Sequence, residues 1–152
     1  MSTATMNVET QKKDEEAILS ILSTLSQANH DKSAAAFAAA FAPNAAIFNL
    51  APPLTHHGVD LEEKQAWFDS WETSVEIEAR DFKITVAGDL AFGHGFLHMS
   101  GTKKGAEREV SFWMRETVCL ERNGSGWKIV HEHTSVPFYM DGSLRPAFDL
   151  NP

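Results

Sequence analysis

The chain divides into two halves by the spacing of its hydrophobic residues, which is helical in the first half and alternating in the second. Near the start, five apolar residues lie three or four positions apart, as on one face of a helix: Ile18, Ile21, Leu22, Leu25 and Ala28. This spacing predicts an amphipathic helix over about residues 11–29.

A short second helix is predicted directly after the first. Ser33 can cap its N-terminus, and Phe37 and Phe41 lie on one of its sides. The dipeptide Pro43-Asn44 ends it. The following segment "AAIFNL" is typical of a short strand, and a loop with two prolines comes next.

A third helix is predicted to begin at the sequence Asp-Leu-Glu-Glu, residues 60–63, which is a capping signal. Trp67 and Trp71 lie one turn apart on this helix, and Phe68 lies beside them. An aromatic stripe of this kind packs in a core more often than it binds a ligand, because large rings contribute most when they are buried.

From residue 75 onward the hydrophobic pattern alternates, which is typical of strands. Apolar residues occupy the odd positions from Val75 to Ala79 and the even positions from Phe82 to Val86. A bulge is therefore expected near Arg80-Asp81. Three further strands are predicted over residues 90–100, 108–122 and 127–138. Three helices followed by a four-stranded antiparallel meander predict an α+β fold.

The stretch "WKIVHEHTSVPF" raises the question of a metal site, because two histidines flank a glutamate. Residues 123–126 are predicted to be the hairpin turn before it. Side chains of a strand alternate between its faces, so His131 and His133 lie on one face and Glu132 on the other. The three side chains are therefore not expected to bind one ion, and no metal site is predicted.

The hairpin register defines two faces of the predicted sheet. The first face, in the register that groups bulky residues, carries Phe92, His94, Phe96, His98, Phe112, Met114, Glu116, Val118, Leu120, Trp127, Ile129, His131 and His133. The second face carries Ala91, Gly93, Gly95, Leu97, Met99, Trp113, Arg115, Thr117, Cys119, Val130, Glu132, Thr134 and Val136. An arginine and a glutamate on the mostly apolar second face are unfavourable unless they are paired or used.

The first face is too large and apolar to be left to solvent, so it is predicted to form a homodimer. His131, His133, Trp127 and Glu116 are the expected interface residues. In this register Glu116 lies opposite His133.

Composition narrows the class of protein. The 152 residues fit one domain with a real core. With 13 basic and 21 acidic residues the net charge is −8, which argues against a nucleic acid or an anionic membrane as partner. The sequence has no apolar run long enough to span a membrane and no apolar signal core, so a cytoplasmic location is expected. The single cysteine, Cys119, excludes an internal disulfide, and no cofactor-binding motif is found.

Four stretches carry a resemblance to a known family: "NHDKSAAAFAAAFAPNAAIFN", "HHGVDLEEKQAWFDSW", "GDLAFGHGFLHMSG" and "RETVCLERNGSGWKIVHEHTSVPF". The chain resembles nuclear transport factor 2-like proteins, in particular the SnoaL-like subgroup, and is similar to the association domain of calcium/calmodulin-dependent kinase II. The resemblance implies a domain over residues 11–140, with a flexible N-terminus (1–10) and a C-terminal tail (141–152). It also implies a cone in which a curved sheet encloses a pocket, with the second face inward and the first face toward a partner subunit.

Proteins of this family have several different functions. Ketosteroid isomerase, a relative, uses a tyrosine of its first helix; here the one tyrosine is Tyr139, near the C-terminus. The kinase association domain has arginines in its pocket. The resemblance places Leu97, Thr117 and Thr134 of this chain at the corresponding positions. SnoaL-like cyclases use an acidic base without a cofactor, and Glu132 is the nearest candidate for it.

Three functional readings follow. The first is a protein that binds a small molecule in the cone without catalysis. The second is a cofactor-independent isomerase, cyclase or lyase acting on a small apolar carbonyl compound, with Glu132 as the base and Arg115 holding an oxyanion. The third is a dimerisation or assembly module. The expected ligand-binding residues are Trp67, Phe68, Trp113, Arg115, Thr117 and Thr134.

Overall fold

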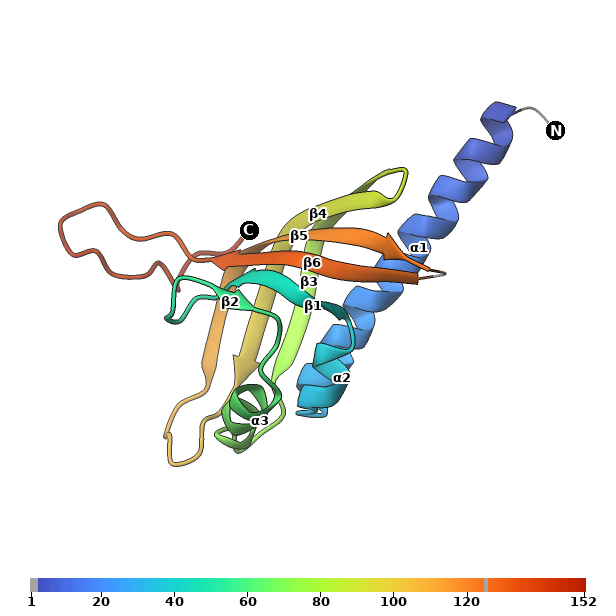
Figure 1. Cartoon of the computed structure of the whole chain (residues 1–152). Coiled ribbons are helices and arrows are strands. Elements are labelled where there is room, and N and C mark those ends of the chain that lie inside the picture. Colours follow the sequence, from blue (N-terminus) through green and yellow to red (C-terminus); the bar gives the residue numbers. More distant parts are fainter. Residues whose placement is uncertain (1–2, 125) are drawn as a thin grey trace.

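The fold is α+β, as predicted: three helices pack against one curved six-stranded sheet (Figure 1). The computed structural model describes residues 3–124 and 126–152. Its elements, in chain order, are α1 (Thr3–His30), α2 (Ala34–Ala38), β1 (Phe41–Phe48), β2 (His56–His57), α3 (Leu61–Asp69), β3 (Glu76–Ala87), β4 (Leu90–Gly101), β5 (Val110–Asn123) and β6 (Gly126–Ser135). Within these described residues, no helix is both long and apolar enough to cross a membrane.

The strands are arranged in the order β2-β1-β6-β5-β4-β3. Strands β3 to β6 form the predicted antiparallel meander. Strand β1 adds to it by pairing with β6 in a parallel direction, which makes the sheet mixed. The short strand β2 pairs with β1 and brings the chain to the start of α3. In Figure 1, α1 and α3 lie on the side toward which the sheet curves.

Helix α1 is longer than the sequence pattern predicted. It begins at Thr3, so residues 3–10, expected to be a flexible terminus, are helical, and residues 1–2 lie outside the described part of the chain. Its N-terminal end projects beyond the sheet (Figure 1). The predicted apolar face is confirmed, since Ile18, Leu25 and Ala28 are buried.

An arginine at the end of β5 ties α1 to the sheet. Arg122 donates two hydrogen bonds to the Asp14 carboxylate, of 3.0 and 2.8 Å, and a third of 2.8 Å to Asp89. Its guanidinium lies 4.5 Å from the ring centre of Trp127. Two parallel bonds to one carboxylate fix orientation as well as distance, so this contact joins α1 to the end of β5 in a defined geometry.

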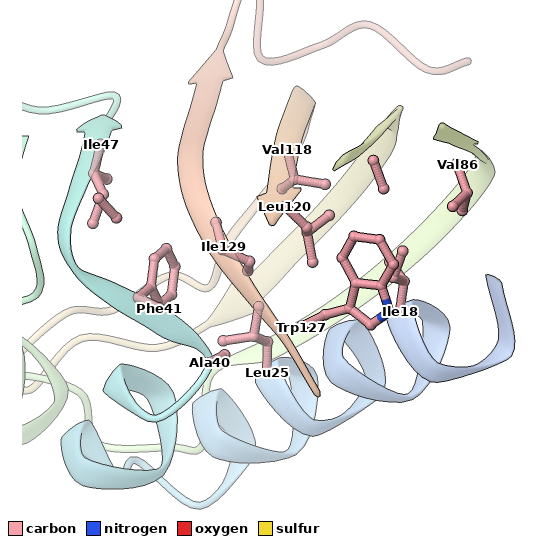
Figure 2. Close-up of a cluster of buried hydrophobic side chains, with 12 residues drawn as sticks. Ile18, Leu25, Ala40, Phe41, Ile47, Val86, Val118, Leu120, Trp127 and Ile129 are labelled. Carbon is pink, nitrogen blue, oxygen red and sulfur yellow. The ribbon is translucent and has the colours of Figure 1, made fainter. Parts of the chain in front are cut away.

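The main core lies between α1 and the sheet. Figure 2 shows Ile18 and Leu25 of the helix facing Trp127 and other apolar residues of the strands. Trp127 is 4% exposed, and Val118, Leu120 and Ile129 are fully buried. The prediction that these four residues lie on the outer face, with Trp127 at a subunit interface, is therefore wrong.

A β-bulge in β6 explains part of this error. The predicted hairpin register is confirmed at its start, where Arg122 pairs with Trp127 and Leu120 with Ile129. Cys119 then pairs with His131, so β6 contains one extra residue at this point, Val130. One inserted residue reverses the face of everything beyond it.

The same reversal places Glu132 on the face that carries Trp127 and Ile129. All three are buried, although strict alternation would put Glu132 on the opposite side.

The register between β4 and β5 explains the rest of the error. Leu97 pairs with Met114, so odd-numbered residues of β4 share a face with even-numbered residues of β5. The outer face of these two strands carries Phe92, His94, Phe96 and His98, as predicted, together with Trp113, Arg115, Thr117 and Cys119, which were expected on the inner face. This face still carries aromatic rings, with Phe92 47% exposed, and a homodimer formed through it stays a prediction.

The predicted bulge of β3 is confirmed. Pairing with β4 shifts between Arg80 and Lys83, and Asp81 has a positive φ of 52°. Phe82 consequently turns its ring toward Gly95, where an added Cβ would lie 2.6 Å from the Phe82 Cδ2 atom. The absence of a Cβ atom on Gly95 leaves the space that this ring occupies.

The residues after β6 form a looped hairpin. Tyr139 and Arg145 are joined by a backbone hydrogen bond of 2.9 Å, and Ala147 is buried. The ring of Phe148 lies against that of Phe112, with centres 4.5 Å apart. The hairpin extends away from the cone and returns to it, as Figure 1 shows.

Candidate functional site

A cavity of about 550 Å³ lies between α1, α3 and the inner face of the sheet. Its wall is mainly apolar, with a small number of polar groups, as is usual for pockets that bind small molecules. The apolar lining includes Leu22, Phe37, Ile47, Val59, Trp67, Ile77, Phe82, Leu97, Met99 and Met114. The polar lining includes Asn29, His56, Lys64, Glu116, Glu132 and Thr134.

Three of the predicted site residues meet in this cavity. Trp67 of α3 and Glu132 and Thr134 of β6 all line it. Phe68 is fully buried behind Trp67, with ring centres 5.3 Å apart, and supports the wall without lining it. The roles of these four residues in ligand binding or catalysis stay predictions.

Trp113, Arg115 and Thr117 do not face the cavity, contrary to prediction. They lie on the outer face of β5, where Arg115 is exposed and donates a hydrogen bond of 3.1 Å to the Ser135 hydroxyl. Trp113 packs against His98, with ring centres 5.0 Å apart. The bulge at Val130 is the cause, because it places Glu132 on the same face as the even-numbered residues of β5.

The bulge brings two carboxyl groups together inside the cone. Glu116 pairs with Thr134 and Glu132 with Val118, so the two glutamates are diagonal neighbours on one face. They are only 6% and 8% exposed, and a hydrogen bond joins them. Glu116 was predicted to lie at a subunit interface opposite His133; the structure places it in the cavity instead.

The buried environment of this carboxyl pair favours the protonated form of Glu116. Burial raises the pKa of Glu116 well above its ordinary value, and the charge of Glu132 and the hydrogen bond to it add to the rise. Burial also raises the pKa of Glu132, but the bond from Glu116 and the charge of Lys64 oppose that rise. Glu116 is therefore the acid that donates the hydrogen bond, and Glu132 is the carboxylate that accepts it.

Lys64 extends from α3 into the same cavity. Its ammonium lies 3.9 Å from the ring centre of Phe37, 4.4 Å from that of Trp67 and 4.7 Å from that of Phe68. Burial lowers the pKa of Lys64 to about 8, and the charge of Glu132 limits the decrease. Glu116, Glu132 and Lys64 thus supply the site with an acid, a carboxylate and a weakly basic amine.

Lys64 and Glu116 are the site residues that the sequence reasoning missed. A signal for Lys64 is present, because it precedes Trp67 and Phe68 by three and four residues and so shares their side of the helix. For Glu116 no local signal exists, since its face depends on a bulge in the neighbouring strand.

His131 and His133 lie outside the cavity. Their rings pack against Phe48, at centre distances of 4.8 and 5.3 Å. The Nδ1 atom of His131 donates a hydrogen bond of 2.7 Å to the Ala46 carbonyl. Their interface role stays a prediction. Across residues 3–124 and 126–152, no three or more His, Cys, Asp or Glu residues are grouped to bind a metal ion.

The buried carboxyl pair predicts that stability falls as pH rises. Below the ordinary glutamate pKa of 4.5, Glu116 is protonated in both the folded and the unfolded chain. Its contribution to the free energy of unfolding is then fully present. Above it the folded state retains a proton that the unfolded chain loses, so stability decreases by at most about 1.4 kcal/mol per pH unit for one proton. The decrease ends once the pH exceeds the folded pKa.

Urea unfolding across this pH range measures the effect. Glu116→Gln keeps a hydrogen-bond donor and cannot ionise, so its stability should depend less on pH than that of the unchanged protein. Glu121→Gln, on an exposed part of the same strand, is the matched control. Equal pH dependence in the Glu116→Gln variant and the unchanged protein would contradict the shared proton.

Comparisons with known proteins agree with this architecture. The profile of the SnoaL-like domain matches residues 18–139. A nuclear transport factor 2-like protein of unknown function from Pseudomonas putida is 26% identical over 100% of this chain and 99% of its own, with a TM-score of 0.79. No curated protein sequence matches the chain.

More distant structures share the fold alone. A candidate scytalone dehydratase from Novosphingobium aromaticivorans is 13% identical, covers 91% of this chain and 94% of its own, and has a TM-score of 0.77. A candidate dehydratase of the nuclear transport factor 2-like family from Streptomyces avermitilis is 15% identical, covers 82% and 97%, and has a TM-score of 0.70.

Proposed function

The chain belongs to the SnoaL-like domain family of the nuclear transport factor 2-like superfamily, and from this membership and its cavity we propose a cofactor-independent acid–base enzyme. Its substrate is a small, mostly apolar carbonyl compound. The reaction class is proton transfer next to the carbonyl group, as in an isomerase, a cyclase or a lyase. The cavity of about 550 Å³ is large enough for a compound of one or two rings.

The observation that carries this proposal is the hydrogen-bonded pair of Glu116 and Glu132 in an apolar cavity. Glu132 is the base that removes a proton from the carbon beside the carbonyl group. Glu116 is the acid that donates its proton to the oxygen on which negative charge develops. Two carboxyl groups with different environments can thus perform opposite roles at one pH.

Proton transfer next to a carbonyl group is compatible with the names of two proteins that share this fold. A dehydration next to a carbonyl group needs a base to remove a proton and an acid to protonate the departing hydroxyl. The candidate dehydratases from Novosphingobium aromaticivorans and Streptomyces avermitilis share the fold of this chain. Their names support proton-transfer chemistry as the class to test first.

Deuterium exchange tests the proposal. Ketones with one or two rings and β-hydroxyketones are incubated with the protein in deuterated buffer, and loss of the α-proton signal is followed by NMR. Thr134→Trp fills the cavity, whereas Thr117→Trp places the same side chain on the outer face of the adjacent strand. We expect exchange with the unchanged protein and with Thr117→Trp, and its loss with Thr134→Trp.

Binding without turnover is the alternative function, and the mainly apolar wall of the cavity favours it. Such a protein would gain thermal stability from the same compounds, and Thr134→Trp would abolish the gain. Thermal stabilisation without any deuterium exchange would therefore replace the acid–base proposal with this one. Equal exchange in the two tryptophan variants would contradict catalysis inside the cavity.

A further inference from the structure

The acid–base proposal gives no task to Lys64, although this residue lines the cavity. Its ammonium is surrounded by the rings of Phe37, Trp67 and Phe68. Among the described residues it forms no hydrogen bond and no ion pair within 4.0 Å. A structural lysine normally reaches water or a carboxylate, so a lysine held among rings inside a ligand cavity is in an unusual position.

The surroundings of Lys64 favour a reactive amine. Burial beside the aromatic rings lowers the pKa of Lys64 to about 8, so about a tenth of the side chains are neutral at pH 7. A neutral amine has the lone pair that attacks a carbonyl carbon. The other titratable groups that line the cavity are Glu116, Glu132, His56, Asp60 and Glu63. The charge of Glu132 limits the decrease in the pKa of Lys64.

Two of those neighbours can serve the chemistry of an amine. The negative charge of Glu132 interacts with Lys64 and would stabilise the positive charge of an iminium ion. Glu116 holds a proton that can be delivered to an oxygen atom. The cavity therefore combines a nucleophile, an acid and a counter-ion.

We propose that Lys64 forms a Schiff base with an aldehyde or ketone bound in the cavity. This inference rests on the proposed function and narrows its substrate class to aldehydes and ketones, because esters and carboxylic acids form no imine. The neighbouring carboxyl pair would then act on the imine.

The step is balanced without an oxidant or a reductant. The lone pair of the neutral Lys64 amine forms a C–N bond, and the oxygen of the former carbonyl takes one proton from Glu116. One proton of the amine nitrogen returns to Glu116, which then gives it to the hydroxyl group. The C–O bond breaks, water leaves, and C=N forms with the other amine proton still on the nitrogen. Protonation of the imine nitrogen makes the neighbouring C–H bond more acidic, so Glu132 removes its proton more easily than from the free carbonyl compound.

Reductive trapping tests the inference. The protein is incubated with benzaldehyde and cyanoborohydride, which reduces an imine to a stable amine. Benzaldehyde has no α-proton, so labelling is measured independently of proton transfer. We expect one benzyl group per chain, located at Lys64 by peptide mass spectrometry, and labelling that increases as the pH rises toward about 8.

Two variants define the site of labelling. Lys64→Arg keeps the positive charge and cannot form an imine, so labelling should fall at least tenfold. Lys103→Arg is the matched control, because Lys103 also lies over aromatic rings but donates a hydrogen bond of 2.7 Å to Ser70. It should label as the unchanged protein does. Thermal unfolding checks that both variants are folded.

The outcomes separate this inference from the proposed function. Labelling at Lys64 without deuterium exchange of any ketone would support the Schiff base and overturn the acid–base proposal. Unchanged exchange in Lys64→Arg would overturn the Schiff base and leave the acid–base proposal standing. Labelling spread over surface lysines would overturn it as well. So would stabilisation of the protein by benzoate without labelling by benzaldehyde, since Lys64 would then be an ion-pairing residue.

Discussion

Replacing Glu132 by glutamine is expected to lower kcat by about two to four orders of magnitude on any substrate of the cone, the range that loss of a general base gives. The amide has the shape of the carboxylate and cannot take a proton. The fold should persist, because the amide oxygen of the new side chain would still accept the hydrogen bond that Glu116 donates. Steady-state kinetics on a ketone found by deuterium exchange measures the effect.

Two substitutions on the other side of the sheet serve as controls. Arg115→Gln removes the residue that sequence reasoning had paired with Glu132, and Glu121→Gln makes the same chemical change at an exposed position of β5. Both variants should keep the rate of the unchanged protein. A normal rate in Glu132→Gln would exclude Glu132 as the base, and a large loss in Arg115→Gln would contradict the observed faces of β5.

Replacing Trp127 by alanine is expected to destabilise the folded chain by about 3–5 kcal/mol, the range for removal of a buried aromatic ring. Trp127 is 4% exposed and packs under α1 with Ile18 and Leu120 (Figure 2). Its removal also takes away the ring on which the Arg122 guanidinium lies. Urea unfolding followed by circular dichroism measures the loss.

The matched control is Trp113→Ala on the outer face. Trp113 is only half-buried, so its removal should cost clearly less than that of Trp127. A subunit-interface role for Trp127 would give a different result, in which Trp127→Ala changes self-association in sedimentation and leaves unfolding of the single chain almost unaltered. The opposite ranking of the two variants would contradict the core assignment.

The sequence by itself determined the local elements of this protein. Hydrophobic spacing identified the buried face of α1, and the Asp60 side chain caps α3 by accepting a hydrogen bond from the Glu63 amide, as predicted. The alternation of Phe82 with its neighbours identified the bulge of β3. These features depend on residues close in sequence, whose periodicity or hydrogen bonding is local.

Only the tertiary structure decided which side chains enter the cone. The extra residue Val130 in β6 reverses the face of Glu132 relative to β5, and so exchanges Arg115 for Glu116 as its neighbour. Whether an extra residue is accommodated depends on strands and helices that pack from elsewhere in the chain, and a shift of one residue inverts every side chain beyond it. The carboxyl pair and its proximity to Lys64 are therefore properties of the assembled cone, because three separate elements, β5, β6 and α3, must meet to create them.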